Sequence, residues 1–299
     1  MSDDTIKATR REFLKGAGAA ALTVAGICSI PQMASAEGSS TGAHADPWAM
    51  LIDIARCQGC DSCALACKEA NQLPLKENPP AKLDADTYTF VDRRQVTVAN
   101  GEVETRYVKR QCMHCLNASC VSACPAAAMH KTEEGPVYYR ANRCLGCRYC
   151  QIGCPFGVPQ FDWNNGLTPE ISKCWMCYER LQKGEQPACI EACPTGAIRF
   201  GPRSRMLAIA HARIDSNPGH YIDHVYGEHE VGGTAMLYIS DVPFEQLGFP
   251  ANLPTTAPPE ETEKIMTKLP FVIGGLAVAL SGTAAYTHRH SHETEITEE

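Results

Sequence analysis

Apolar positions in the middle of the chain come in short runs, which predict short strands and loops rather than long helices. Met50 to Ala55 is expected as a strand that leads into a cysteine-rich loop. Gln95 to Val98 and Glu102 to Val108 flank Asn100-Gly101, which is a strong hairpin signal. Further strands are predicted at 136–139, 197–200 and 234–240, and one outer helix at 205–214.

A longer apolar run, residues 269–286, lies near the C-terminus and contains no charged residue. Its length is at the short end of the about 17–25 residues that a membrane helix needs, and a buried core helix is the alternative. A proline- and acid-rich linker, 250–268, separates it from the body, which favours a transmembrane helix with a small-residue packing face. Residues 287–299 are then expected as a cytoplasmic tail.

The N-terminus carries features of an export signal. Arg10 and Arg11 precede a mild apolar run, and Ala34-Ser35-Ala36 follows as a cleavage site. These features predict a twin-arginine signal peptide over residues 1–36, with an uncleaved N-terminal anchor as the alternative. Because that route carries folded proteins, cofactors would be inserted before export.

Sixteen of the seventeen cysteines fall into four groups of four, and Cys28 in the predicted signal is the remaining one. Two groups read C-x2-C-x2-C-x3-C, while the second stretches one gap to x4 and the fourth stretches one to x11. Pro125, Pro155 and Pro194 follow the last cysteine of three groups, whereas Lys68 follows that of the first. The groups are Cys57/Cys60/Cys63/Cys67, Cys112/Cys115/Cys120/Cys124, Cys144/Cys147/Cys150/Cys154 and Cys174/Cys177/Cys189/Cys193.

This spacing is the bacterial ferredoxin run, repeated four times. Three cysteines on a tight loop can direct their thiolates to one iron–sulfur cluster. The fourth begins a helix, points away and ligates the other cluster of a two-cluster fold. The proline after it fits because it needs no backbone donor.

Zinc, disulfides and covalent haem are the competing interpretations of the cysteines. Zinc sites commonly use two C-x2-C pairs, and a third cysteine followed by x3-C-P departs from that pattern. An exported protein can hold disulfides, but cysteines so close in sequence bridge poorly. Covalent haem requires C-x-x-C-H, and no cysteine pair here precedes a histidine.

The net charge of −7 and the lack of a basic patch argue against a nucleic-acid partner. Basic residues beside the cysteines would offset the negative charge of clusters, although ordinary surface charge explains each equally well. They are Lys68, Arg110, Arg143, Arg148, Lys173 and Arg180. Four histidines without a convincing ligand spacing are expected as surface or core residues: His211, His220, His224 and His229.

Neither a Walker A loop nor a G-x-G-x-x-G dinucleotide fingerprint accompanies the cysteines. The sequence therefore favours electron transfer over bond-making chemistry. A self-contained redox enzyme would need an open cluster site, hence a missing cysteine, and none is missing. A purely structural metal module is the third hypothesis, and it would lack reversible reduction.

The residues of four stretches strengthen this interpretation beyond the cysteine spacing itself. These stretches are 109–115, 144–150, 226–234 and 241–244. With them, the chain resembles the four-cluster ferredoxin-like iron–sulfur subunits of periplasmic membrane-bound oxidoreductases. The resemblance is strongest to the iron–sulfur subunit of nickel–iron hydrogenase-2, followed by formate dehydrogenase beta subunits. It covers nearly the whole chain, including the twin-arginine signal and the C-terminal anchor.

The resemblance implies an α+β fold with two pseudo-symmetric ferredoxin-like two-cluster modules in 48–202 and a β-hairpin insertion. A helix-and-strand extension would follow at 203–249. It also implies four 4Fe–4S clusters, no catalytic residue, and a place on the periplasmic side of the inner membrane. There the subunit would join a catalytic oxidoreductase subunit, nickel–iron hydrogenase first and a molybdopterin enzyme as the alternative, to an integral membrane quinone-reactive or cytochrome b subunit.

The ligand sets that the resemblance implies are nested. Each set takes three cysteines from one group and the last cysteine of another. They are Cys57, Cys60 and Cys63 with Cys193; Cys174, Cys177 and Cys189 with Cys67; Cys112, Cys115 and Cys120 with Cys154; and Cys144, Cys147 and Cys150 with Cys124.

Overall fold

The computed structural model describes residues 46–98, 101–163 and 170–296. The predicted signal peptide, with Arg10, Arg11 and Cys28, lies outside these residues, as does Asn100 of the predicted hairpin turn. Of the predicted tail, the structure describes the backbone as far as Ile296.

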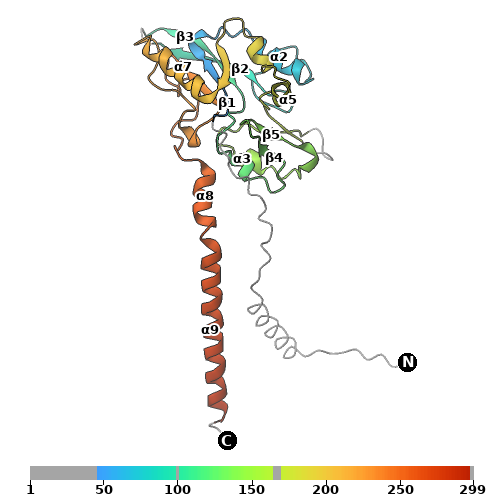
Figure 1. The fold of residues 1–299 in the computed structure, drawn as a ribbon, viewed down its shortest axis with the longest axis vertical. Helices are drawn as coiled ribbons and strands as arrows, with labels where there is room; N and C mark the ends of the chain where they lie inside the picture. Colours follow the sequence, from blue (N-terminus) through green and yellow to red (C-terminus); the bar gives the residue numbers. More distant parts are fainter. Residues whose placement is uncertain (1–45, 99–100, 164–169, 297–299) are drawn as a thin grey trace, which may run out of the picture. The chain divides into compact units, whose positions relative to one another are not determined.

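The largest sheet has three strands in the order β8-β1-β9 (Figure 1). Its central strand, β1 (Trp48–Asp53), is antiparallel to β8 (Ile198–Pro202) and parallel to β9 (Met236–Ile239). The central strand is buried except at its first residue, as the apolar sequence at 48–52 requires. Both neighbours of β1 therefore come from the far end of the body.

Helix α7 (Arg203–Asp215) packs against β1 and closes the main hydrophobic core. Asp53, at the end of β1, is fully buried and accepts hydrogen bonds from Arg213 and from the hydroxyl of Tyr221. Arg203 donates to the backbone carbonyls of residues 227, 228 and 234. These contacts tie the extension after residue 202 to the sheet, because buried polar groups need partners.

Three antiparallel pairs accompany the sheet. A long hairpin joins β2 (Phe90–Thr97) to β3 (Val103–Arg110), and a short one joins β4 (Met129–Lys131) to β5 (Val137–Tyr139). Strands β6 (Gln160–Phe161) and β7 (Ile171–Ser172) form the third pair. Residues around β4 and β5 form a hydrophobic cluster of their own, separate from the main core.

The helices between the strands are short, and the prolines explain their lengths. Helices α3 (Ser119–Ser122), α4 (Tyr149–Ile152) and α6 (Ala188–Glu191) stop just before the cysteine-proline step. Where Lys68 replaces the proline, α2 (Ser62–Ala70) continues past the cysteine. Helix α5 (Tyr178–Gln182) and three 3-10 turns, η1 (Ile54–Arg56), η2 (Ala141–Arg143) and η3 (Glu230–Gly232), complete the body.

The expected strands, hairpin and outer helix are all present within a few residues of their predicted bounds. The linker, however, contains a helix that its composition did not predict, α8 (Pro258–Met266). Prolines in its first turn, followed by Glu260 and Glu261, suit a helix N-terminus because proline needs no donor there and acidic groups complement the helix dipole.

The apolar run forms helix α9 (Leu269–Ile296), which continues beyond the expected end at residue 286. In the part of the chain that the structure describes, the helical stretch Pro258–His288 is long and apolar enough to cross a membrane. Its large apolar side chains, such as Phe271 and Val278, are exposed. The fold is thus a mixture of small sheets and short helices with one apolar C-terminal helix, in agreement with the predicted α+β class.

One tight backbone crossing in this fold can be tested. A Cβ atom at Gly227, whose φ is 98°, would collide with the carbonyl oxygen of Met236 and the hydroxyl of Thr234. We expect Gly227→Ala to lower the free energy of unfolding by about 3 kcal/mol or more, because strain and steric overlap add. Gly219→Ala, at φ 81° in open space, should cost only about 1–2 kcal/mol. Thermal denaturation of the full-length variants would measure both, and equal losses would contradict the crossing.

Candidate metal centre

The four cysteine loops share one backbone feature. In each, the residue before the second cysteine has a positive φ: 71° at Gly59, 48° at His114, 68° at Gly146 and 56° at Met176. This left-handed turn brings the first two cysteines of a group to the same side of the loop. A non-glycine residue in this left-handed conformation costs roughly 1–2 kcal/mol of conformational free energy. The surrounding packing must therefore hold His114 and Met176 in place.

The strand pairs decide which groups meet. Strand β1 leads into the first group and pairs with β8, which follows the fourth group, through Ile52 and Ile198. Strand β4 follows the second group and pairs with β5, which precedes the third, through Met129 and Tyr139. The first group therefore lies beside the fourth, and the second beside the third.

A narrow cavity lies between the first and fourth groups. Its lining combines four thiols with apolar side chains from the sheet and one buried lysine, Lys109. The thiols belong to Cys57, Cys60, Cys63 and Cys193. Burial by itself would raise the pKa of Cys193. Hydrogen bonds to its sulfur, the largest contribution coming from the backbone N–H of Ile198, outweigh this effect, so the pKa lies below its usual value.

A second set of thiols surrounds Cys67. Burial, and after it the nearby thiols of Cys174, Cys189 and Cys177, hold the pKa of Cys67 well above its ordinary value. The backbone N–H of Met176 donates to the sulfur of Cys174 at 3.3 Å, as N–H groups around a thiolate do. The last cysteine of the first group thus lies among three cysteines of the fourth.

The last cysteines of the second and third groups likewise lie near thiols of the other group. Burial raises the pKa of Cys115 well above its usual value, and Cys112, Cys154 and Cys120 add to the effect. Burial likewise raises the pKa of Cys150 to about 11, with contributions from the thiols of Cys124, Cys144 and Cys147.

The buried thiols need a positive partner. All sixteen cysteines of the described body are free thiols, so none forms a disulfide. Burial raises the pKa of Cys63 to about 12 although Lys109 acts in the opposite direction. A thiol with such a pKa stays protonated at neutral pH until a metal stabilises its thiolate. Chemically, four soft sulfur donors around a dry cavity fit an iron–sulfur cluster.

Of the sixteen cysteines, seven are buried, seven are half-buried and two are exposed. Cys60 and Cys147, the second cysteines of the first and third groups, are the exposed ones.

Among the described residues, no three His, Cys, Asp or Glu side chains gather closely enough to hold a single metal ion.

The basic residues beside the cysteines differ in what they do. Lys173 is buried and donates to the backbone carbonyls of Val137 and Cys174. Lys68 is also buried but donates to the carbonyls of a neighbouring loop. Arg180 forms surface ion pairs with Glu185 and Glu191, and Arg148 lies over the rings of Phe161 and Trp163. Two lysines inside the body were not predicted, since a lysine in a strand is expected at the surface. Lys109 is buried, and Lys131 is half-buried and donates to the carbonyl of Cys115.

The four histidines lie at the surface, as expected. His211 pairs with Glu228 at 3.0 Å and His224 with Glu230 at 2.8 Å, and both rings are about half exposed. His114, which the sequence did not single out, is instead fully buried, and its Nδ1 accepts a hydrogen bond from the backbone N–H of Val137.

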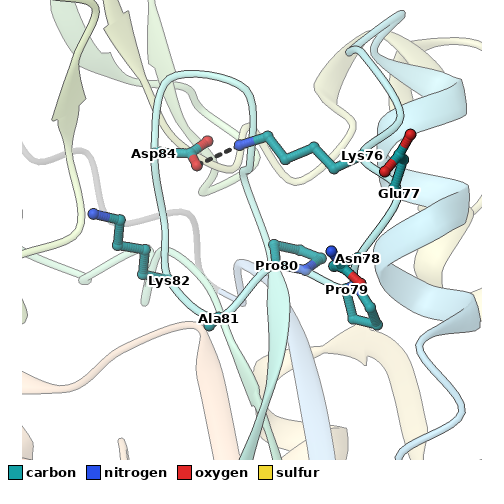
Figure 2. A pocket seen from close by; sticks show the side chains of 8 residues that line it. All are labelled: Lys76, Glu77, Asn78, Pro79, Pro80, Ala81, Lys82 and Asp84. Carbon is teal, nitrogen blue, oxygen red and sulfur yellow. Dashed lines mark hydrogen bonds and ion pairs between the residues drawn. The ribbon is translucent and has the colours of Figure 1, made fainter.

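A wider hollow than the thiol-lined cavity lies away from the thiols, in the loop between α2 and β2 (Figure 2). It measures about 570 Å³ and is bounded by loop residues, with Pro79 and Pro80 at one side and the ion pair of Lys76 and Asp84 at the other. Its lining contains no cysteine or histidine, and the side chains that Figure 2 labels do not converge on a common point.

Comparisons with known proteins agree with the cysteine geometry. A family model described as a 4Fe-4S dicluster domain matches residues 103–203, which span the last three cysteine groups. The hydrogenase-2 operon protein HybA of Escherichia coli O157:H7 is 33% identical over 323 residues, which cover 93% of this chain and 97% of HybA. The iron–sulfur subunit of the nitrate-inducible formate dehydrogenase of Escherichia coli K12 is 37% identical over 202 residues, 64% of this chain and 67% of that subunit.

A third similarity is to a protein of Nitratidesulfovibrio vulgaris Hildenborough, which is 41% identical over 295 residues. It covers 94% of this chain and 77% of that protein.

The loop of the first group offers a direct test. A Cβ at Gly59 would overlap the ring of Tyr107, in addition to the strain of a φ of 71°. We expect Gly59→Ala to displace the loop and to reduce the iron bound by the full-length protein. Gly157→Ala, at φ 61° with open space around it, carries the strain without the overlap and serves as the control. Iron analysis and visible absorbance would separate the two, and an equal loss in both would show that the Tyr107 contact is unimportant.

Proposed function

Because the chain belongs to the family of iron–sulfur proteins that includes HybA of Escherichia coli O157:H7, we propose that it is an electron-transfer subunit of a membrane-bound oxidoreductase. The observation that carries this proposal is the cavity whose lining contains Cys57, Cys60, Cys63 and Cys193. These thiols come from opposite ends of the body, and a ferredoxin-type fold requires this exchange of the fourth ligand.

The chain is proposed to hold four 4Fe–4S clusters in two ferredoxin-like modules. The outer module takes its cysteines from the first and fourth groups, and the inner module from the second and third, with the ligand sets given under Sequence analysis. Each cluster accepts and releases one electron at a time, while the loops and buried lysines set its position and surroundings. No residue of the described body is assigned a bond-making role.

The proposed order of the clusters is supported by three electrostatic interactions between thiols of different sets. Cys63 interacts electrostatically with Cys189, Cys174 with Cys112, and Cys120 with Cys150. Cys112 and Cys174 also share one small hydrophobic cluster. The four ligand sets then form a line, and we number the sets along it. Each set is identified by the cysteine that it takes from another group: Cys193 in the first set, Cys67 in the second, Cys154 in the third and Cys124 in the fourth.

The exposed cysteines occupy the two ends of this line. Cys60 belongs to the first set and Cys147 to the fourth, so both terminal clusters would lie near the surface. Solvent-exposed ends suit transfer to and from other subunits. We propose a periplasmic catalytic subunit at one end and an integral membrane quinone-reactive or cytochrome b subunit at the other.

Membrane attachment is proposed through α9. Helix α8, which leads into it, contacts α3 in the inner module, where Asn117 donates to Glu260 at 3.4 Å. This contact supports a position of the inner module close to the start of α9. The twin-arginine motif supports export of the loaded protein, with the body on the periplasmic side of the inner membrane.

A nickel–iron hydrogenase is the first candidate for the catalytic partner, because the similarity to HybA extends over 97% of that protein. A molybdopterin enzyme such as formate dehydrogenase is the second candidate. It is supported by the higher identity, 37%, of the formate dehydrogenase iron–sulfur subunit over its shorter alignment.

The cluster count can be measured directly. With every ligand position occupied by cysteine, the anaerobically purified full-length protein should contain about sixteen iron atoms and as many acid-labile sulfides. EPR of the reduced protein should show interacting 4Fe–4S centres. A large isotropic signal of a 3Fe–4S centre in fresh anaerobic protein, or a structural metal without reversible reduction, would contradict the proposal.

The exchange of ligands predicts which cluster each substitution damages. Cys193→Ser should disturb the cluster held by Cys57, Cys60 and Cys63, because oxygen is a harder and poorer ligand for this iron. In the assembled complex, electron flow to the membrane should stall, while dye reduction by the catalytic partner should persist. Cys124→Ser is the matched change in the inner module and should disturb a different EPR signal.

The outcome against this assignment is equally specific. If Cys193→Ser perturbs only the cluster of Cys174, Cys177 and Cys189, the nested ligand sets are wrong. If it abolishes dye reduction as well, the subunit is required for assembly of its partner.

A further inference from the structure

Lys109 lies on β3 and is one of the largest fully buried side chains of the described body, with 2% of its surface exposed. Its carbonyl accepts a hydrogen bond from the hydroxyl of Tyr238 at 2.9 Å, which fixes the backbone. Its ammonium donates to the hydroxyl of Thr89, also at 2.9 Å. Within the described residues, this is the one hydrogen bond of the ammonium, and no carboxylate pairs with it.

Among the described residues, the two other buried lysines, Lys173 and Lys68, have better-compensated ammonium groups. Lys173 donates to two backbone carbonyls, at 2.7 and 2.9 Å, and lies 4.8 Å from the centre of the Trp175 ring. Lys68 also donates to two carbonyls, at 2.9 and 2.6 Å. A single hydroxyl is a weak partner for a buried charge, and an ion removed from water without compensation is costly. Lys109 therefore requires negative charge from another source.

The thiols around Lys109 belong to two different ligand sets. It lines the cavity of the first set, where it interacts with Cys63. It also interacts electrostatically with Cys189, Cys174 and Cys67, which all belong to the second set. The buried ammonium thus acts on thiols of both sets of the outer module, and both sets would be negatively charged once they hold clusters.

We propose that Lys109 is the shared counter-ion of the first and second clusters and raises the reduction potentials of both. The inference rests on the proposed function, because it requires that these thiols hold clusters. A cluster becomes more negative by one charge when it accepts an electron. A nearby cation that water does not screen stabilises that reduced form, so removal of the cation makes reduction harder.

A shared position between the clusters also distinguishes Lys109 from a residue that tunes a single centre. The same charge acts on both, so their potentials should move together when it is removed. The interactions of Lys109 involve thiols of the first two sets, whereas Lys173 interacts with Cys120 and Lys131 with Cys115 of the third set. The third and fourth clusters should therefore be affected much less.

The test uses neutral variants in the full-length, cluster-loaded protein. Lys109→Met keeps the approximate shape of the side chain, and Lys109→Gln keeps a hydrogen-bond donor for Thr89. Arg56→Met is the matched control, because Arg56 is an exposed cation beside Cys57 that donates to the carbonyl of Thr195 at the rim of the same cavity. Potentiometric titration followed by EPR measures the midpoint potential of each cluster.

We expect two of the four midpoints to fall in both neutral variants. The equilibrium constant for reduction should decrease about tenfold or more at each, which corresponds to about 59 mV for one electron. The cluster that Cys193→Ser perturbs must be one of the two. Arg56→Met should shift the same midpoint far less, because water and salt screen an exposed charge.

Unchanged midpoints, a shift of one cluster alone, or an equal shift in Arg56→Met would overturn the proposal. If neither neutral variant loads the two clusters but Lys109→Arg does, the charge is required for them and the proposal stands. If Lys109→Arg fails as well, the position acts through its shape and the proposal is wrong. A native protein without four clusters would instead defeat the proposed function, whereas four clusters with unchanged potentials would defeat only the role of Lys109.

Discussion

The burial of many thiols in one small body is the constraint on which the rest of the structure depends. A buried thiol resists ionisation, as the raised pKa values of Cys63, Cys115 and Cys174 indicate. Sulfur that must become thiolate in a dry interior needs cations next to it, and metal and lysine are the two kinds of cation available. Folding and metal binding are therefore coupled, as in other small metalloproteins whose sites supply much of the folding free energy.

The strands serve this constraint more than they build a conventional core. The central strand β1 brings the loop of the first group beside β8 and the fourth group, and the β4–β5 hairpin does the same for the inner groups. Most other connections are loops and four-residue helices that end at a cysteine-proline step. The apolar residues of the main core mostly come from the sheet, from α7 and from the segment after it. The extension after residue 202 thus acts as a support for the metal-binding loops.

Much of this arrangement could be predicted from the sequence, because the cysteine spacing and the prolines act locally. The strand before Cys57, the long hairpin and α7 follow from local apolar patterns, and the structure contains them. The parallel pairing of β1 with β9 depends on residues far apart, which periodicity does not encode. The burial of Lys109 could not be predicted either. A lysine between Val108 and Arg110 is expected at the surface, and only the neighbouring strands and loops of the folded chain show that it is buried.

The linker shows a related limit. Its prolines and acids predicted a linker, yet the same residues favour a helix start when they fall in the first turn, and they begin α8. The meaning of such residues depends on position as well as on composition.

The placement of β1 has a consequence for biosynthesis. The inner hairpin pairs Lys131 with Val137, so it can form soon after these residues leave the ribosome. The outer sheet cannot close until β8 and β9, which begin at residues 198 and 236, have been synthesised. The first loop must then wait, exposed and oxidisable, through most of translation. A nascent chain built in this order depends on a reducing cytosol and on protection of its N-terminal cysteines.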